Sequence, residues 1–316
     1  MMVEFIVRLR QFGKEMSKHT VKEWMIAVRP WSFPASVMPV AVTLGYLAWR
    51  GAQIDWLCGV LAIVNIVLFH AAGNTWSDYF DYKRGVDAHD TYGAKTLTDN
   101  MFTPKEIYKL SIGLLVVALI LGAVLMVLSS WQLIWFGIAG ALLTMLYPKL
   151  KYSALGDIDI ILTYAVLPTL GTCYVATGNI DYSVLLLAVP LGLITDSILH
   201  ANNARDIETD KRAGISTFAM KIGIKRSVYL YCMELIIPYL WVIGCVVCGY
   251  LPWWSLLVLV AIKPAYDNIN RANSRLKGNS EAFAILDEAS AKLQLMFSLL
   301  LIVSFVVSLV IAALVS

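Results

Sequence analysis

Two groups of acidic and amide side chains stand at helical spacing in this sequence. The first stripe is Asn74, Ser77, Asp78 and Asp81, and the second stripe is Asn202, Asn203, Asp206 and Asp210. Residues three or four apart share one face of a helix, so each group presents a row of oxygen atoms. Carboxylates that converge without a cation repel one another. Magnesium prefers carboxylate oxygens together with phosphate oxygens, so the two stripes predict the two halves of a site for magnesium and a diphosphate.

Basic side chains accompany both stripes. They are Arg29, Lys83, Lys151, Arg205 and Lys211. Arginine binds phosphate through two parallel hydrogen bonds, and lysine supplies a point charge. We therefore expect these five side chains, together with Asn74, Ser77, Asn202 and Asn203, to bind the diphosphate. The four aspartates Asp78, Asp81, Asp206 and Asp210 are the predicted metal ligands and catalytic groups.

A single charge near a helix end is ordinarily an interfacial anchor or a solvated group. We assign that ordinary role to four further acids, namely Asp87, Asp90, Asp99 and Glu208. Asp159, Asp196 and Glu234 lie close to or inside apolar segments. For these three, a polar contact between helices is as good an interpretation as a functional role.

The composition identifies the class of protein. Of the 316 residues, 59% are hydrophobic and only 15% are charged, whereas soluble domains carry about 25% charged residues. Apolar runs of bilayer-spanning length recur along the chain, which predicts an all-α, polytopic membrane bundle of about nine transmembrane helices. The predicted spans are 31–49, 56–80, 107–128, 131–148, 158–177, 182–204, 227–249, 252–266 and 291–315. The eighth is the weakest, because it is short and ends at Lys263 and Pro264.

The placement of basic residues predicts the orientation. If the N-terminus is cytoplasmic, Arg50 is the one member of the 25 Lys and Arg residues that falls in an outer loop. Cytoplasmic loops of membrane proteins are enriched in these residues, so we expect both stripes at the cytoplasmic side. We divide the chain into a cytoplasmic or interfacial segment, 1–28, and a single transmembrane domain, 29–316. The expected location is a bacterial-type inner membrane.

Four stretches of the chain resemble motifs of a known family. They are residues 78–87, residues 202–214 followed by Ser216 and Thr217, Arg29-Pro30 with Ser36 and Pro39, and Lys151-Tyr152 with Gly156 and Asp157. These stretches are similar to the UbiA superfamily of intramembrane aromatic prenyltransferases, and most of all to its 1,4-dihydroxy-2-naphthoate polyprenyltransferase branch. By this resemblance, the family's metal and diphosphate role falls on Asp78, Asp81, Asp206 and Asp210.

The resemblance implies a reaction and its participants. A magnesium-dependent enzyme would transfer a polyprenyl group from polyprenyl diphosphate to 1,4-dihydroxy-2-naphthoate, with loss of carbon dioxide, to give demethylmenaquinol. The implied partners are these two substrates and the lipid bilayer, and we expect no nucleic acid. Two other aromatic acids, 4-hydroxybenzoate and homogentisate, remain alternative acceptors. A cation-coupled transporter is an alternative from a different class, because acids within membrane helices also occur there.

Overall fold

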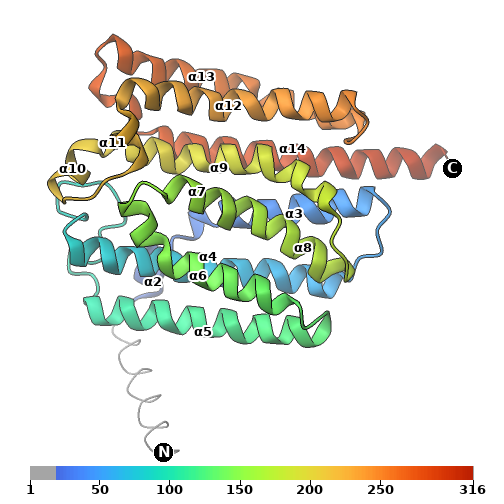
Figure 1. The fold of residues 1–316 in the computed structure, drawn as a ribbon, viewed down its shortest axis with the longest axis horizontal. Helices are drawn as coiled ribbons and strands as arrows, with labels where there is room; N and C mark the ends of the chain where they lie inside the picture. Colours follow the sequence, from blue (N-terminus) through green and yellow to red (C-terminus); the bar gives the residue numbers. More distant parts are fainter. Residues whose placement is uncertain (1–18, 316) are drawn as a thin grey trace, which may run out of the picture.

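The structure of the chain is a computed structural model that describes residues 19–315. Within that range it is built from helices and contains no β-strand. In chain order the elements are α2 (Val21–Val28), η1 (Pro30–Ser32), α3 (Pro34–Trp49), α4 (Trp56–Arg84), α5 (Pro104–Leu128), α6 (Leu133–Tyr152), α7 (Gly156–Ile161), η2 (Leu162–Val166), α8 (Leu167–Thr177), η3 (Tyr182–Val184), α9 (Leu185–Arg205), α10 (Ile207–Arg212), α11 (Phe218–Ile222), α12 (Ile224–Val247), η4 (Trp253–Ala261), α13 (Ile262–Ser274), η5 (Arg275–Lys277), η6 (Ser280–Phe283) and α14 (Leu286–Val315). The long helices run side by side along one direction (Figure 1).

Seven helices of the described residues are long and apolar enough to cross a membrane, or up to eight if a bent pair counts as one span. They correspond to seven of the predicted spans. The bent pair corresponds to the first span, because Val21–Ser32 meets Pro34–Trp49 at 49°. The predicted segment 252–266 is helical but forms the 3₁₀-helix η4 and the start of α13. The membrane-bundle class is confirmed, while the count of about nine spans stays a prediction.

Helix α4 carries the first stripe in its last turns. Its N-terminus is capped by Asp55, whose side chain accepts the Cys58 N–H at 3.0 Å. Its C-terminus is Gly85, which takes the left-handed conformation (φ 74°) that glycine adopts without a steric penalty. A helix of 29 residues is roughly 44 Å long, which exceeds the roughly 30 Å hydrocarbon core of a bilayer. The stripe can therefore sit at the membrane boundary while the rest of α4 crosses it.

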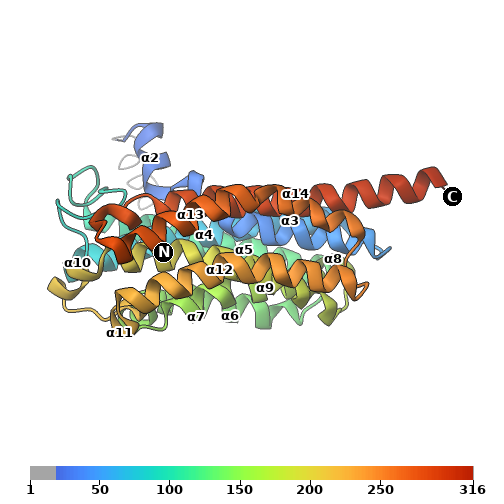
Figure 2. The ribbon, with the colours of Figure 1, turned by 90° about the horizontal axis from the view of Figure 1, so that it is seen from above.

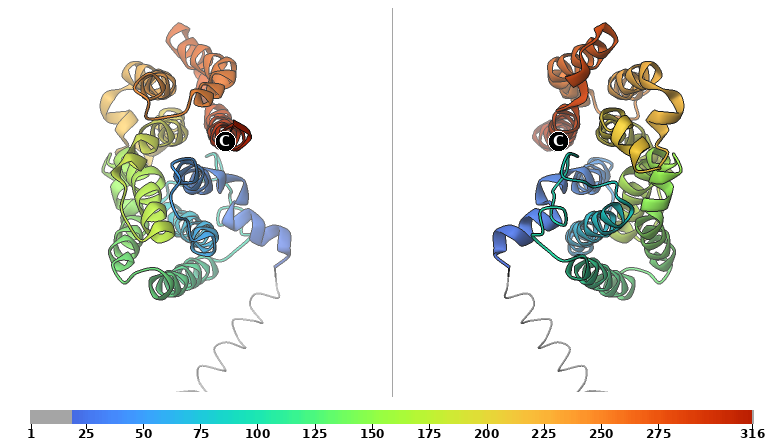
Figure 3. Two further views of the ribbon diagram at one scale, coloured as in Figure 1. Left: turned by 90° about the vertical axis from the view of Figure 1, so that its right-hand side faces the viewer. Right: turned by 90° about the vertical axis from the view of Figure 1, so that its left-hand side faces the viewer.

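The second stripe spans the end of α9 and the start of α10: Asn202 and Asn203 lie in α9, Asp206 caps it, and Asp210 lies in α10. Helix α9 is the most enclosed of the seven apolar helices. It contacts α12, α14 and α7. The large buried side chains of this half include Leu191, Tyr231, Phe297 and Phe305. An end-on view shows α9 and α3 inside the bundle, with α5 and α13 at its two extremes (Figure 3). A helix that is packed on several sides holds the asparagines and aspartates at its end in fixed directions.

One end of the bundle gathers the irregular segments. Helices α10 and α11 lie there together with the loop between α4 and α5, while the last turns of α14 extend beyond the other helices at the opposite end (Figure 2). A backbone hydrogen bond from Ser216 N–H to the Tyr152 carbonyl, at 3.1 Å, joins the loop after α10 to the end of α6. Both stripes therefore approach the same end of the molecule.

Candidate active site

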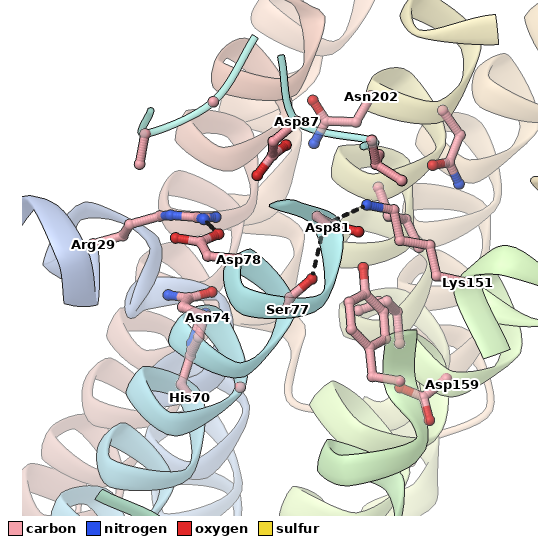
Figure 4. Close-up of a pocket in the computed structure, with 18 of the residues that line it drawn as sticks. Arg29, His70, Asn74, Ser77, Asp78, Asp81, Asp87, Lys151, Asp159 and Asn202 are labelled. Atoms are coloured by element: carbon pink, nitrogen blue, oxygen red, sulfur yellow. Dashed lines mark hydrogen bonds and ion pairs between the residues drawn. The ribbon is translucent and has the colours of Figure 1, made fainter. Parts of the chain in front are cut away.

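A polar cavity of about 240 Å³ lies where α4, α6, α7, α9 and α10 meet. It is lined by all but two of the residues predicted for the site, namely Arg29, Asn74, Ser77, Asp78, Asp81, Lys151, Asn202, Asn203, Arg205, Asp206 and Asp210. Figure 4 shows side chains from the end of α4 and from α6, α7 and α9 pointing toward this cavity. The structure thus brings together two groups that are far apart in the sequence.

The remaining two predicted residues, Lys83 and Lys211, are exposed and do not line the cavity. Lys83 follows Asp81 by two positions, which turns it roughly 200° around the helix. Its Nζ instead lies 5.7 Å from the centre of the Tyr79 ring. Lys211 directly follows Asp210 on α10 and points to a different side of that short helix.

Asp81 is the most heavily bonded carboxylate of the first stripe. It accepts hydrogen bonds from Lys151 Nζ at 3.0 Å, Tyr152 Oη at 2.7 Å and Ser77 Oγ at 3.1 Å. The lysine and the tyrosine come from the last turn of α6, and the serine stands one turn before Asp81 on α4. Both Asp81 and Lys151 are largely shielded from solvent. This contact joins α4 to α6 across the cavity.

Asp78 pairs with Arg29, which reaches it from the segment before the first predicted span. Arg29 has a left-handed backbone (φ 55°), an unusual conformation for a residue other than glycine and one typical of functional sites. Asn74 supports this approach, because its amide donates hydrogen bonds to the Val28 carbonyl and to Ser32 Oγ, each at 3.1 Å. In this structure Asn74 therefore positions the segment that carries Arg29.

Arg205 organises the second stripe. Its guanidinium donates two hydrogen bonds to Asp206, each at 2.8 Å, and a third to Asp287 at the start of α14, also at 2.8 Å. The Tyr92 ring lies 4.2 Å from the guanidinium carbon, within range for a cation–π interaction. Asp210 is 4% exposed and lines the same cavity from α10.

Acids outnumber basic side chains in the cavity. Six aspartates line it, namely Asp78, Asp81, Asp87, Asp159, Asp206 and Asp210, against three basic side chains, Arg29, Lys151 and Arg205. Burial raises the pKa of Asp210 to about 7, and the neighbouring Asp206 and Asp81 carboxylates add to this shift while Lys151 opposes it. Burial also raises the pKa of Asp87 to about 6, with Asp81 as a further cause. The cavity therefore holds an excess of negative charge that favours a bound cation.

Whether these residues fit a divalent metal follows from the donor atoms. Among residues 19–315, no three His, Cys, Asp or Glu side chains converge closely enough to hold a metal ion as they lie. The carboxylates instead face Arg29, Lys151 and Arg205. The donors are nevertheless oxygen atoms of the kind that magnesium binds. One of them, Asp78 Oδ2, is buried without a hydrogen-bond partner. The residue set fits magnesium, provided that the carboxylates turn from their basic partners toward the metal.

Several cavity residues lie outside the predicted set. The main ones are Asp87, Tyr92, Tyr147, Asp159, Tyr164 and Thr209. The expectation that Asp87 is a solvated loop charge was wrong, because its loop folds back over the cavity and shields it. The only sequence signal for Asp87 was its place in the first family-like stretch. The other three acids given a solvated role, Asp90, Asp99 and Glu208, are exposed.

A second cavity adjoins the first and differs from it in chemistry. It has a volume of about 520 Å³ and is lined mainly by apolar side chains of α4, α5, α6 and α8. Four residues line both cavities, namely Ile66, Phe69, Thr144 and Thr163. Thr163 stands in η2, a π-helical turn just before Pro168. Proline cannot donate a backbone hydrogen bond, and π-turns of this kind are frequent at functional sites. Together the cavities offer a polar end and an apolar end to one ligand.

Comparison with known proteins identifies the family. The model of the UbiA prenyltransferase family matches residues 36–275. UbiA prenyltransferase domain-containing protein 1 of chicken (Gallus gallus) is 35% identical over 286 residues, which cover 87% of this chain and 82% of that protein. The mouse (Mus musculus) protein of the same name is 33% identical over 289 residues, covering 89% and 83%. These relatives support the superfamily but do not single out the dihydroxynaphthoate branch. Because they are animal proteins, they do not support the expected bacterial-type membrane.

Solved structures share the fold. A UbiA homologue from Aeropyrum pernix, in its apo form, superposes with a TM-score of 0.63 at 15% identity, covering 87% of this chain and 98% of that one. A UbiA homologue from Archaeoglobus fulgidus, bound to DMAPP and Mg²⁺, gives 0.60 at 16% identity, covering 87% and 99%. At these identities the likeness concerns the fold alone. The seven apolar helices make this chain a multi-pass membrane protein, and the family match over most of its length shows that it belongs to the UbiA prenyltransferase family.

Proposed function

We propose that this protein transfers a polyprenyl group from a polyprenyl diphosphate to an aromatic acid. The observation that carries the proposal is the joined pair of cavities: a polar one that holds both aspartate stripes, and an apolar one that continues from it. A polyprenyl diphosphate has the same division into a charged head and a hydrocarbon tail. We assign the activity to residues 29–316 as one domain, with the polar cavity on the cytoplasmic side.

The diphosphate would lie among Arg29, Lys151 and Arg205. In this structure each of these cations forms an ion pair with a carboxylate. When the aspartates bind the metal instead, each cation would be released to bind a phosphate oxygen. Magnesium, when bound by Asp78, Asp81, Asp206 and Asp210, would draw electron density from the diphosphate and favour cleavage of its bond to C1. The same three basic side chains would stabilise the negative charge of the departing diphosphate. The archaeal relative that binds DMAPP and Mg²⁺ supports this choice of ligands.

The chain would also protect the reaction from water. An allylic cation that meets water becomes an alcohol, so the apolar cavity and the loop over the polar cavity must exclude solvent. Val86, Thr91 and Tyr92 of that loop line the polar cavity. Tyr147 and Tyr164 offer ring faces beside it, and a ring face attracts a cation by about 0.5–2 kcal/mol. These side chains would hold the cation and keep the site dry.

For the acceptor we propose 1,4-dihydroxy-2-naphthoate. The support is the resemblance of residues 78–87 and 202–214 to that branch of the family. Carbon attack on the prenyl C1 with loss of carbon dioxide would give demethylmenaquinol. The alternatives are 4-hydroxybenzoate and homogentisate, which share the hydroxylated ring.

The test is direct measurement of transfer. Purified protein in lipid nanodiscs is mixed with Mg²⁺, labelled geranyl diphosphate and each of the three aromatic acids in turn. We expect a labelled, prenylated product and release of diphosphate with 1,4-dihydroxy-2-naphthoate, and neither after magnesium is removed with a chelator. Transfer to one of the other acids instead would change the proposed acceptor but would still support the proposed prenyl transfer. A folded protein that releases no diphosphate with any acid would contradict the proposal.

A further inference from the structure

Asp159 is a buried carboxylate of the polar cavity that the diphosphate site does not use. It stands on α7, is 2% exposed and lines the cavity. Its Oδ1 is buried and has no hydrogen-bond partner. No Lys or Arg is recorded in contact with it among the described residues, in contrast to Asp78, Asp81 and Asp206. A buried carboxylate oxygen without a partner is costly, so it marks a place where a ligand can donate a hydrogen bond.

Asp159 lies one helical turn from the junction of the two cavities. Thr163 follows it by one helical turn and lines both the polar and the apolar cavity. Figure 4 shows Asp159 on the opposite side of the polar cavity from Arg29 and Asp78. Arg29 therefore lies on one side of the cavity and Asp159 on the other, near Thr163 and the apolar cavity. Lys151 stands on the same side as Asp159, but its Nζ reaches across to Asp81 at 3.0 Å.

The prenyl C1 must lie near that junction. C1 joins the charged head to the hydrocarbon tail, so it sits where the polar cavity meets the apolar one. An aromatic acceptor must bring a ring carbon to within about 3–3.5 Å of C1 to react. Tyr147 of α6 and Tyr164 of η2 line the same cavity as Asp159, and both are close enough to feel its charge. Two aromatic rings beside a free carboxylate oxygen form a suitable place for a hydroxylated ring.

We propose that Asp159 is the catalytic base for the acceptor, an inference that rests on the proposed function. Its carboxylate takes the proton of a ring hydroxyl, and the oxygen keeps the O–H electron pair as a phenolate. The ring carbon then forms a bond to C1, while the C1–O bond breaks and its electron pair leaves with the diphosphate. With a naphthoate acceptor, the ring carboxylate leaves as carbon dioxide and its bonding pair restores the aromatic ring. The proton on Asp159 passes to solvent as the product leaves.

A purely structural role explains Asp159 less well. A carboxylate that joins helices would be expected to have its oxygens satisfied by a neighbouring element. Its neighbour Asp157 joins α7 to α9 through Oδ1, which pairs with His200 Nδ1 at 3.1 Å, although its Oδ2 is buried without a partner. Asp157 does not line the cavity. Asp159 stands two positions later and therefore on the opposite side of α7, toward the cavity. Asp159 differs from Asp157 in that no ion pair joins it to another helix among the described residues and that it lines the substrate-sized cavity.

The experiment compares Asp159→Asn with Asp196→Asn. Asp196 is a matched control, because it is also buried (4% exposed), has an oxygen without a partner and does not line the cavity. Three quantities are measured on each purified protein: binding of geranyl diphosphate with Mg²⁺, diphosphate release without acceptor, and transfer to 1,4-dihydroxy-2-naphthoate. For Asp159→Asn we expect geranyl diphosphate binding and acceptor-free diphosphate release to stay within about twofold of wild type. We expect kcat for transfer to fall about 10²–10⁴-fold, the usual contribution of a general base.

The outcomes separate this inference from the proposed function. If the wild-type protein transfers nothing, the proposed function fails. If the wild-type protein transfers and Asp159→Asn does so within about threefold, the base assignment alone fails. An equal loss of transfer in Asp159→Asn and Asp196→Asn would also overturn the base assignment.

If Asp159→Asn does not fold, the variant Asp159→Glu provides the test, because it keeps the negative charge. Transfer by folded Asp159→Glu at more than about one tenth of the wild-type rate supports the base, and a lower rate with normal geranyl diphosphate binding overturns it.

Discussion

At the scale of single residues, three of the four stripe aspartates, Asp78, Asp81 and Asp206, already form an ion pair with a basic side chain. Asp81 is held by Lys151 and Tyr152, and Asp206 by Arg205. An Asn side chain keeps the shape of Asp but loses the charge that holds a metal. We expect Asp81→Asn and Asp206→Asn each to lower kcat for prenyl transfer by about 10²–10³-fold or more, as when a group that stabilises transition-state charge is removed. Labelled geranyl diphosphate in a nanodisc assay measures the loss.

The matched control for these two variants is Asp90→Asn. Asp90 also pairs with an arginine, Arg212, but both side chains are more than half exposed and lie outside the cavity. Exposed pairs of this kind contribute little to stability. We expect Asp90→Asn to keep transfer close to wild type. Retained turnover in both Asp81→Asn and Asp206→Asn would remove the stripes from the active site.

The pKa values of the cavity acids predict how metal binding depends on pH. The pKa of Asp210 is raised to about 7 and that of Asp87 to about 6, so both carboxyls take up a proton as the pH falls through these values. Magnesium needs the ionised form, and its binding therefore releases protons. With a pKa of about 7, the ionised fraction of Asp210 rises from about one tenth at pH 6 to about one half at pH 7, so we expect affinity for Mg²⁺ to rise about fivefold over this range. Calorimetry in two buffers with different ionisation enthalpies counts the proton. An affinity that does not change with pH would contradict this expectation.

Spacing predicted the cavity residues of α4 well, because residues three or four apart on a helix share a face. It does not explain the whole second stripe, because the helix breaks at Asp206 and the separate helix α10 brings Asp210 to the cavity. Lys83 and Lys211 were grouped with the cavity residues because they are close to them in the sequence. Their positions around the helix axis turn them away from the cavity instead. Asp87 and Asp159 were missed for a different reason. Their exposure depends on how the loop after α4 and the short helix α7 pack against distant elements, and local sequence does not determine such packing.

At the scale of elements, the loop between α4 and α5 acts as a cover for the polar cavity. Tyr92 of this loop stacks on Arg205 at 4.2 Å, and Asp90 pairs with Arg212 of α10 at 2.8 Å. The cover is therefore attached at two points, one on each of the helices α9 and α10 that carry the second stripe. Each attachment is weak by itself, since a partly exposed cation–π contact contributes about 0.5–1 kcal/mol. Such a segment can open for substrate entry and close before reaction.

We expect Tyr92→Ala to loosen this cover without removing a metal ligand. Water would then reach the allylic cation more often, so the ratio of prenyl alcohol to prenylated acceptor would rise, by about threefold if roughly 0.6–0.7 kcal/mol of the contact is lost. Chromatography of the products of labelled geranyl diphosphate measures this ratio. Tyr92→Phe retains the ring and should behave like wild type. An unchanged ratio in Tyr92→Ala would show that the loop does not exclude water.

The helical elements themselves were predictable from apolar runs, but their breaks were not. The run 158–177 reads as one span, whereas the structure divides it into α7, a π-helical turn and α8. The division has a local cause, because Pro168 has no N–H to donate to the carbonyl of Tyr164. The consequence for the site is not local: it directs Thr163 and Tyr164 toward the cavities.

At the scale of the whole molecule, the polar cavity and the C-terminal end of α12 lie at opposite ends of the bundle (Figure 1). Helix α12 begins beside α11, at the cavity end, and its 24 residues span roughly 36 Å, about the thickness of a membrane core. Cys248 follows directly after this helix and is exposed, while the other four cysteines, Cys58, Cys173, Cys232 and Cys245, are buried. A single accessible native thiol therefore marks the end of the bundle that is remote from the cavity.

This thiol tests the orientation that the basic residues predict. If both stripes face the cytoplasm, Cys248 lies on the outer side, next to the predicted outer loop 250–251. We expect a membrane-impermeant maleimide to label the wild-type protein in intact cells without permeabilisation, and Cys248→Ser to remain unlabelled. Labelling that appears only after the membrane is opened would place the stripes outside and reverse the predicted topology. Because Cys248 is far from the cavity, its replacement should leave prenyl transfer unchanged, so activity and orientation can be measured on the same variant.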